Sequence, residues 1–287
     1  MQTTEKEQEQ VREERPIITL ITDFGEGYYV AAMKGVILDI CRSACLVDIT
    51  HDIRSHDVLE GAFTLLCTYP YFPPHSVHIA VVDPGVGSER RGIIVATKDH
   101  YFVGPDNGVF SFVYNREPVK KVVSIESQVY LRGTVSPTFH GRDAFSPVAA
   151  WLALGTPLEK FGEEIEDYSG ATVLPVQKVE DDPTRIEGMV IHVDKFGNII
   201  TSISPETAAE QFGYSGSPKF FVKGQTITHS YSYYAEAAPG EIFALVGSSG
   251  YYEIAAHRSR ASDILGVERG EKVQLELHTE SSASSTT

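Results

Sequence analysis

The stretch VHIAVVDPGVG, residues 77–87, decides the fold of the first half of this chain. Its first part, Val77–Val82, is a continuous apolar run of strand length, as expected for a central parallel strand that is buried on both faces. Its second part is a turn in which a proline and two glycines allow the backbone to approach a ligand closely. We therefore expect a buried strand that ends in a functional loop.

The segments around this run alternate between strand and helix patterns. Ile17–Ile21 and Leu46–Ile49 are short strand candidates. Apolar residues at helical spacing predict helices over residues 29–40, 58–69 and 144–154. Alternation of this kind is typical of an α/β layered domain with a mostly parallel sheet.

The second half has a different composition. From Tyr168 onward Gly, Ser, Asp and Pro dominate, which is typical of a linker. Short β-rich runs then follow with turn residues between them: Ile186–Val193, Ile199–Ser202, Lys219–Val222, Ile242–Val246, Tyr251–Ala256 and Lys272–Leu277. No convincing long helix separates them, so this half is expected to form a small β-barrel or sandwich.

Charge and hydropathy exclude several classes of partner. The chain carries 24 Lys and Arg against 39 Asp and Glu, a net charge of −15. Nucleic acids and anionic membranes are held by basic patches, so neither is an expected partner. No apolar run approaches the ~20 residues of a transmembrane helix. The polar stretch up to about residue 15 has no apolar core of a secretory signal, and we expect a cytoplasmic protein.

Disulfide and metal chemistry are not expected either. Three cysteines, Cys41, Cys45 and Cys67, are too few for a disulfide scaffold and are interpreted as small buried hydrophobes. His51 and His56 have acidic neighbours, which suggests a metal site. Their spacing of five residues does not place them on one helical face, so we expect no metal ligands.

Polar side chains follow the predicted strands at their carboxyl ends, where ligands bind in open α/β sheets. Asp23 could accept hydrogen bonds from both hydroxyls of a ribose, or it could cap the helix that follows. Asp83 could face a ligand or close its own turn, with Arg90 and Arg91 in solvent. The local sequence of GPDNG, residues 104–108, indicates only a turn.

The segment TFHGRD, residues 138–143, immediately precedes the last predicted helix of the first half. Asp143 is a natural N-cap, which leaves His140 and Arg142 at the positive end of that helix, where anions are stabilised. In the second half, VDKFGN (193–198) and GSSG (247–250) each join two strands. Both are plausible as plain hairpin connections.

Together these motifs resemble one family from about Ile17 to Leu277. In chain order they are TDFG (22–25), DITH (48–51), VDPGVGSERR (82–91), GPDNG, TFHGRD, VDKFGN and GSSGYYEIA (247–255). The set resembles the S-adenosyl-L-methionine (SAM) hydroxide adenosyltransferases, SAM hydrolases that release adenosine and are related to fluorinating and chlorinating enzymes. The resemblance implies an N-terminal α/β domain (16–167), a linker (168–185) and a C-terminal β-barrel domain (186–278).

The reaction implied by the resemblance is attack of water-derived hydroxide on the ribose 5′ carbon, with methionine as the leaving group. The implied catalytic residues are Asp83, Arg90 and His140, and Arg91 is the alternative to Arg90. A cation favours deprotonation of a neighbouring water, and a histidine can take the proton. The residues implied to bind substrate are Asp23 (ribose), Asp194 (methionine ammonium), Phe196 and Asn198 (adenine), Ser248 and Ser249 (methionine carboxylate), with Asn107 and Glu253.

Two alternatives remain open at this point. A halide could replace hydroxide, but halide needs no base, and Arg91-Gly92 runs straight into the predicted strand Ile93–Thr97 without the extra loop of the halogenating relatives. A protein that only binds SAM or adenosine would have no need of a water-activating His140. The resemblance further implies no cofactor, no metal, and a homotrimer whose active sites lie between the N-terminal domain of one subunit and the C-terminal domain of the next.

Overall fold

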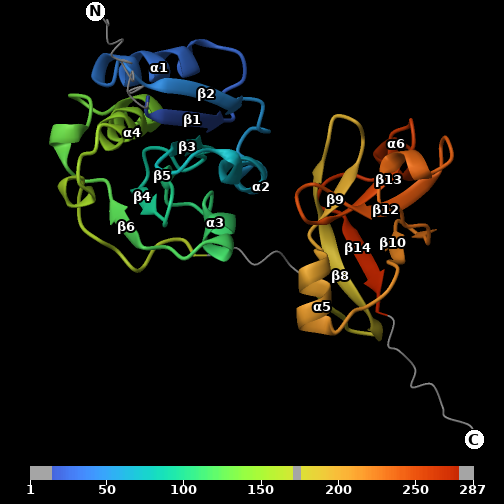
Figure 1. Ribbon diagram of the computed structural model, residues 1–287. Helices are drawn as coiled ribbons and strands as arrows, with labels where there is room; N and C mark the ends of the chain where they lie inside the picture. The colour runs from blue at the N-terminus through green and yellow to red at the C-terminus, as the bar shows by residue number, and fades with distance from the viewer. Residues whose placement is uncertain (1–14, 171–175, 278–287) are drawn as a thin grey trace, which may run out of the picture. The chain divides into compact units, whose positions relative to one another are not determined.

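The computed structural model describes residues 15–170 and 176–277. The chain divides between Ala171 and Thr172 into two compact units, shown in Figure 1. The polar N-terminal stretch up to residue 14 and the Ser/Thr-rich C-terminal end lie outside the described residues. No helix in the two described ranges combines the length and apolar character of a membrane span.

The first unit is a six-stranded sheet in the order β2-β1-β3-β5-β4-β6. Its strands and helices are β1 (Ile17–Thr22), α1 (Tyr28–Ile40), β2 (Cys45–Thr50), α2 (Val58–Thr68), β3 (Val77–Val81), β4 (Gly92–Ala96), β5 (Tyr101–Pro105), α3 (Ser111–Arg116), β6 (Lys121–Ser124) and α4 (Ser146–Ala153). Strands β2, β1, β3 and β5 pair in parallel, whereas β4 is antiparallel to both β5 and β6. The predicted mostly parallel α/β sheet is confirmed.

Strand β3 is the buried central strand that its sequence predicts. Val77, Ile79 and Val81 pack into the core cluster that also contains Phe145. On the other face His78 is fully buried and lies within hydrogen-bond distance of a threonine hydroxyl and a second histidine ring. Burial lowers the pKa of His78 to about 3, so this imidazole stays neutral and the strand carries no charge in the core.

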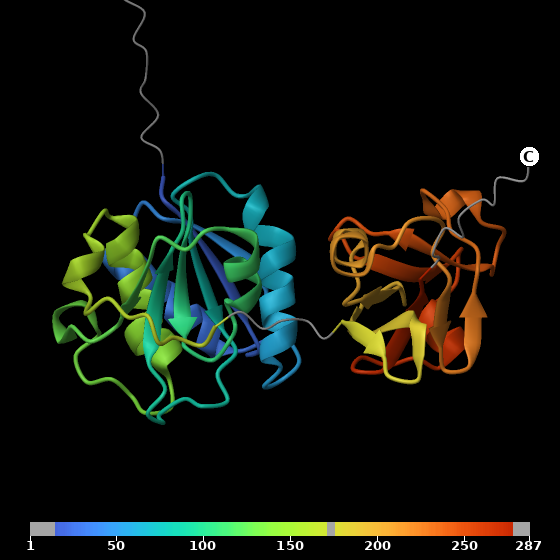
Figure 2. The ribbon, with the colours of Figure 1, turned by 90° about the horizontal axis from the view of Figure 1, so that it is seen from below.

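The helices cover both faces of this sheet, as Figure 2 shows. α1 and α4 pack on each other, and α4 lies against β1 and β3. α2 contacts β1 and β3 and packs against α3. Since β1, β3 and β5 are parallel, the loops that follow them leave the sheet at the same edge.

Two local expectations in this unit are wrong. The helix predicted over 144–154 begins earlier, because a π-helical turn at Gly141–Phe145 leads directly into α4. Only Cys41 is buried as predicted; Cys45 begins the edge strand β2 and is exposed, and Cys67 is half-buried. All three thiols are free.

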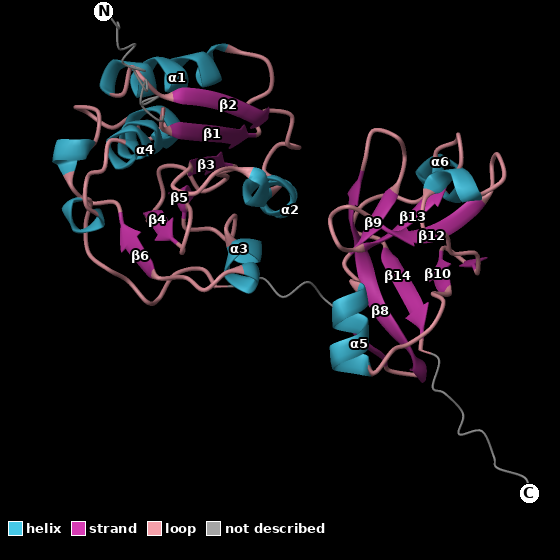
Figure 3. Cartoon of the chain, viewed as in Figure 1, coloured by secondary structure: helices cyan, strands magenta, loops and turns pink. Residues whose placement is uncertain are grey.

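The second unit is a nearly closed antiparallel barrel, shown in Figure 3. The strands follow the order β11-β10-β14-β8-β9-β13-β12, with β7 on β8, and the end strands β11 and β12 contact each other. The elements are β7 (Gln177–Val179), β8 (Asp182–Val193), β9 (Ile199–Thr201), α5 (Pro205–Phe212), β10 (Phe220–Val222), β11 (Gln225–Ile227), β12 (Ile242–Val246), β13 (Tyr252–Ala256), α6 (Ala261–Leu265) and β14 (Lys272–Glu276). The barrel is therefore confirmed over the sandwich.

Some elements of this unit escape the strand pattern. β7 and the first residues of β8 lie inside the segment 168–185 that was expected to be a linker. The short helix α5 is capped by Ser204, whose hydroxyl accepts a hydrogen bond from the N–H of Thr207, and it ends at Gly213 with φ of 68°. Such a short helix carries too few apolar positions to produce a clear periodicity.

We expect Gly104 in β5 to tolerate no side chain. A Cβ there would overlap the carbonyl oxygen of Ala80 and lie 2.9 Å from Phe110. Gly104→Ala should lower the free energy of unfolding by about 1–3 kcal/mol in urea denaturation. The matched control is Gly35→Ala in α1, where the new methyl meets nothing within 4 Å and should stabilise by up to about 1 kcal/mol. Equal effects of the two substitutions would contradict this prediction.

Candidate active site

The loop after β3 is folded by its own turns and held close to a second loop. The N–H of Val86 donates to the carbonyl of Asp83, and the N–H of Ser88 donates to that of Gly85. Gly87 adopts φ of 80°, and a Cβ at this position would overlap the carbonyl oxygen of Pro137. The glycine therefore lets the loop after β3 approach the segment that leads to His140.

Asp83, Arg90 and His140 form one side-chain cluster. The Arg90 guanidinium donates from Nε to Asp83 Oδ1 at 2.9 Å and from Nη2 to Asp83 Oδ2, a bidentate ion pair. Its Nη2 also contacts His140 Nδ1 at 2.7 Å. The side chains of Arg90 and Asp83 are only 11% and 5% exposed, so water screens the pair weakly.

The arginine fixes the state of His140. A guanidinium has donors only, so Nδ1 accepts this hydrogen bond and a neutral ring carries its proton on Nε2. Burial and then the Arg90 cation lower the pKa of His140, while Asp83 and Asp143 oppose the shift. The imidazole is therefore neutral at neutral pH and is able to accept a proton.

The segment that carries His140 is organised differently from the sequence prediction. Asp143 does not cap a helix; it lies inside the π-helical turn, where Arg142 donates to both of its carboxylate oxygens at 2.7 Å. Asp143 Oδ2 also accepts from the N–H of Ser136 at 3.0 Å, which closes the loop in front of His140. Phe145 then lies under Arg90, with its ring centre 5.4 Å from the guanidinium carbon.

Asp23 does not cap α1, so that alternative is wrong. The residue before α1 is Gly27, and it makes no side-chain cap. Asp23 Oδ2 instead accepts a hydrogen bond of 2.9 Å from the N–H of His56, a residue in the left-handed region with φ of 68°. The carboxylate is thereby oriented at the carboxyl end of β1, and its half-buried side chain keeps acceptor capacity for a ligand.

The DITH motif supports the loop that carries Asp23. His51 Nδ1 lies 2.9 Å from the hydroxyl of Thr22, and its Nε2 lies 3.1 Å from a carboxylate oxygen of Asp48. The carbonyl of His51 accepts from the N–H of Gly25 at 2.8 Å. This histidine therefore has structural partners, and within residues 15–170 and 176–277 no group of three or more His, Cys, Asp or Glu side chains is arranged to hold a metal ion.

The two neighbouring arginines have different partners. Arg90 contacts Asp83 and His140, as described, whereas Arg91 binds Asp106 at 3.0 Å and Asp167 at 2.8 Å. Asn107, the other candidate of the loop after β5, donates from its amide to the carbonyl of Val82 at 2.8 Å and accepts from the N–H of Val109. The Asn107 side chain thus ties its loop to the end of β3.

In the second unit the loop between β8 and β9 is built around Asp194. Its Oδ1 accepts from the N–H groups of Phe196 and Asn198 at 2.8 and 2.9 Å, and its Oδ2 accepts from the Asn198 amide at 3.0 Å. Gly197 adopts φ of 82° directly against Arg260. Phe196 stays 64% exposed, so its ring is available to stack on a flat ligand.

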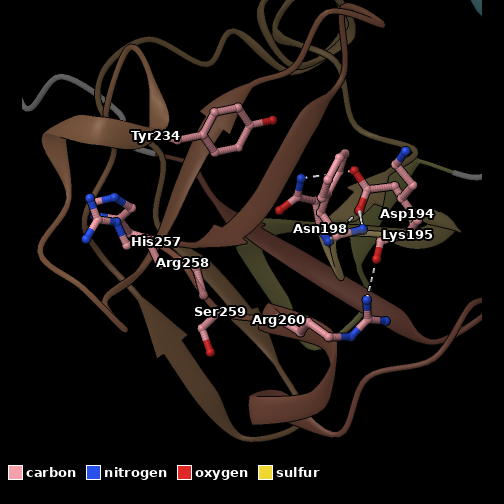
Figure 4. Close-up of a pocket in the computed structure, with 10 residues that line it drawn as sticks. Asp194, Lys195, Asn198, Tyr234, His257, Arg258, Ser259 and Arg260 are labelled. Atoms are coloured by element: carbon pink, nitrogen blue, oxygen red, sulfur yellow. Dashed lines mark hydrogen bonds between the residues drawn. The ribbon is translucent and has the colours of Figure 1, made fainter.

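A pocket of about 640 Å³ opens beside this loop, and Figure 4 shows the side chains around it. Its lining residues are Asp194, Lys195, Phe196, Asn198, Tyr234, Ala256, His257, Arg258, Ser259 and Arg260. Arg260 fixes the rim, since its guanidinium donates to the carbonyl of Lys195. Sequence reasoning missed Tyr234 and the stretch 256–260, for which the charged run HRSR at 257–260 was the available signal.

The remaining candidates of this unit lie outside the lining of the pocket. Glu253 is 6% exposed and accepts a hydrogen bond of 2.6 Å from the Tyr234 hydroxyl, and burial raises the pKa of its carboxyl. Ser248 and Ser249 form the turn between β12 and β13, where Ser248 is exposed and Ser249 half-buried. Glu253 therefore supports the pocket through Tyr234, and the two serines are not among the residues that line it.

Comparisons with known proteins cover both units. The family model described as the SAM hydroxide adenosyltransferase N-terminal domain matches residues 18–162, and that of the C-terminal domain matches residues 188–274. A (R)-S-adenosyl-L-methionine hydrolase of Methanocaldococcus jannaschii is 36% identical over 274 residues, which is 90% of this chain and 95% of that protein.

A more distantly related enzyme and a solved structure are also similar to this chain. A fluorinase of Actinopolyspora mzabensis is 27% identical over 66% of this chain and 72% of its own length. The crystal structure of an uncharacterized conserved protein from Thermotoga maritima superimposes with a TM-score of 0.81 at 33% identity, covering 90% of this chain and 99% of that one.

The effect of the Arg90 cation on the pKa of His140 should be measurable. We expect Arg90→Met to raise the pKa of His140, because the cation that disfavours the imidazolium is lost while Asp83 and Asp143 remain. NMR titration of the imidazole resonances would measure the change. Lys121→Met, which removes a cation paired with Glu159 and Glu164, is the control and should leave the titration unchanged. A lower or unchanged pKa in Arg90→Met would contradict the assignment.

Proposed function

This chain belongs to the SAM hydroxide adenosyltransferase family, and we propose that it hydrolyses SAM to adenosine and L-methionine. Relatives named (R)-S-adenosyl-L-methionine hydrolase, at 35–37% identity over 90–91% of this chain, support the activity. The observation that carries the proposal is the contact of one guanidinium with both a carboxylate and a neutral imidazole, in Asp83, Arg90 and His140. This is a set of groups able to deprotonate water.

In the proposed mechanism a water enters between Arg90 and His140. Arg90 donates a hydrogen bond to the water oxygen, and the water donates to Nδ1 of His140. The oxygen attacks the ribose 5′ carbon as the C5′–S bond breaks with its electron pair on sulfur, and the water proton passes to Nδ1. Methionine leaves as a neutral thioether, so the leaving group needs no acid. Later loss of the proton to solvent restores His140.

Binding roles follow from the charge of each part of the substrate. We propose that Asp23 accepts the ribose hydroxyls and that Asp194 pairs with the methionine ammonium. Phe196 offers an exposed ring to the adenine, and Asn198 its amide. The other proposed substrate-binding residues are Ser248 and Ser249 for the methionine carboxylate, with Asn107 and Glu253 as supporting groups.

Hydroxide is favoured over halide as the nucleophile. A halide ion is already an anion and has no proton to lose, so a neutral histidine held against an arginine would serve no purpose in halogenation. The relatives named fluorinase are also less similar to this chain, at 24–27% identity.

We also propose that the reaction requires no metal and occurs in the cytoplasm. The Arg90 cation supplies the positive charge that stabilises hydroxide, which is the part a metal ion would otherwise play. An exposed free thiol such as that of Cys45 persists in a reducing compartment.

Assembly as a homotrimer is proposed because candidate groups are divided between the two units of the chain. His140 and Asp83 belong to the first unit, whereas Asp194 and Asn198 belong to the second. An active site completed by the second unit of the next subunit would use all of them, and a head-to-tail contact of this type closes into a ring. Such a site would also exclude bulk water from the sulfonium substrate.

The activity is tested by incubating the protein with SAM and separating the products by chromatography. Wild type should form adenosine and methionine in equal amounts, before and after treatment with EDTA. His140→Ala should lower kcat about 100-fold or more, the lower range for loss of a general base, whereas Lys121→Met should retain activity. Intact SAM after long incubation with folded protein would refute hydrolysis. A halogenated nucleoside formed with fluoride or chloride would favour the halogenase, and tight binding without turnover a SAM-binding protein.

The divided site is tested by mixing two inactive variants. His140→Ala mixed with Asp194→Ala should regain part of the activity after subunit exchange, because some sites combine an intact first unit with an intact second unit. The control mixture is His140→Ala with Asp83→Asn, in which no first unit is intact and no activity should return. A monomeric mass by light scattering, together with full wild-type activity, would overturn the trimer.

A further inference from the structure

Arg91 joins three separate segments of the first unit. It directly precedes β4, and its guanidinium donates to Asp106 Oδ2 at 3.0 Å in the loop after β5. The same guanidinium donates to Asp167 Oδ1 at 2.8 Å and to the carbonyl oxygen of Asp167 at 2.5 Å. Asp167 lies close to the end of the first unit, in the stretch of chain that leads into the second.

Asp106 is the buried junction of these contacts. Its side chain is only 6% exposed. Besides Arg91, its carboxylate accepts from the N–H of Ser169 at 2.7 Å, and its carbonyl accepts from the Ser169 hydroxyl at 3.2 Å. A buried carboxylate that loses its cation is costly, so without the Arg91 guanidinium this junction would have to rearrange.

The junction continues to the catalytic cluster through the backbone of Arg91. The Arg91 carbonyl accepts from the N–H of Asp106 at 2.9 Å and from Nη1 of Arg90 at 3.3 Å. On the other side of Arg90 the turn at residues 87–89 is exposed, and the Arg90 N–H donates to the Ser88 hydroxyl at 3.3 Å. The Arg90 guanidinium is therefore held by the Asp83 carboxylate and, at Nη1, by the Arg91 carbonyl.

We propose that Arg91 is a positioning residue, which clamps Asp106 and Asp167 together and thereby holds Arg90 against His140. The catalytic meaning of this clamp rests on the proposed function, because it assumes that Arg90 and His140 activate water.

If Arg91 only stabilised the fold, its replacement would affect His140 no more than the replacement of another bridging cation. Lys121 is such a cation and provides the comparison. Lys121 bridges Glu159 at 3.1 Å and Glu164 at 3.2 Å, and its side chain is 27% exposed against 34% for Arg91. It begins β6 opposite Ala96, whereas Arg91 stands before the other end of β4. Both residues join two carboxylates, but only Arg91 is linked to Arg90.

The experiment compares Arg91→Met with Lys121→Met, using the pKa of His140 measured by NMR as the first readout. The charged groups that act on His140 are Arg90, Asp83 and Asp143. If the clamp is lost and Arg90 withdraws, the pKa of His140 should rise in Arg91→Met, in the same direction as in Arg90→Met but by less. Lys121→Met should leave it unchanged.

Kinetics supply the second readout. With SAM as substrate, kcat of Arg91→Met should fall by about 10- to 100-fold, as a misplaced catalytic group requires, with KM changed less than about two-fold. The low-pH limb of its kcat profile should move to higher pH, in parallel with the pKa of His140. Lys121→Met should show neither change, even if its thermal midpoint falls equally.

Each outcome bears on the proposal. An unchanged pKa of His140 in folded Arg91→Met would overturn it, as would equal effects of Lys121→Met. If Arg91→Met does not fold, Asp167→Ala replaces it, since this carboxylate is 84% exposed and its removal takes away one side-chain partner of Arg91; a raised pKa of His140, by less than in Arg90→Met, is again required. If wild type fails to turn over SAM, the proposed function fails, while the titration of His140 still decides whether Arg91 positions Arg90.

Discussion

Parallel pairing of β1, β3 and β5 is the constraint on which the first unit depends. It brings the loops after these strands to one edge of the sheet, and Asp23, Asp83 and Asn107 all lie on those loops. The pairing is possible because β3 is apolar enough to be buried on both faces, with His78 kept neutral. His140 reaches the same edge from a different segment, through the π-helical turn packed beneath α1. The site is thus a consequence of strand direction.

At that edge, one cation contacts both an acid and a histidine. Arg90 neutralises Asp83, so the buried carboxylate is not an isolated charge. Burial and then the Arg90 cation lower the pKa of His140, which keeps the imidazole neutral. Asp83 and Asp143 act in the opposite direction and favour the charged imidazolium. The order of the three groups therefore matters: because the arginine lies between the acid and the histidine, the histidine remains a base.

Local patterns in the sequence were sufficient to predict the strands and the fold class. A strand that is buried on both faces, such as β3, is a continuous apolar run, and strands that alternate with helices indicate an α/β layered domain. They failed where the local pattern does not determine which of several partners a side chain takes. Asp143 has the chemistry of an N-cap, yet Arg142 and Ser136 take its carboxylate. The run Arg90-Arg91 does not itself distinguish the two residues, since their side-chain partners lie 7 to 76 positions away. Of the residues named by resemblance, Asp83, Arg90 and His140 contact one another, because the loop after β3 lies against the segment that leads to α4.

The contact between Arg90 and His140 also has a mechanical consequence. In this structure each group satisfies the other, so a water can reach Nδ1 only if it separates them. Insertion of the water replaces one direct hydrogen bond by two that pass through the water, so both groups stay hydrogen-bonded and little free energy is lost. Insertion of the water serves the reaction only if Arg90 moves by the width of one water molecule. A longer movement would leave the new hydroxide without its stabilising cation. A guanidinium that is tied to both oxygens of Asp83 and to the Arg91 carbonyl has that limited freedom, and a guanidinium without these partners does not.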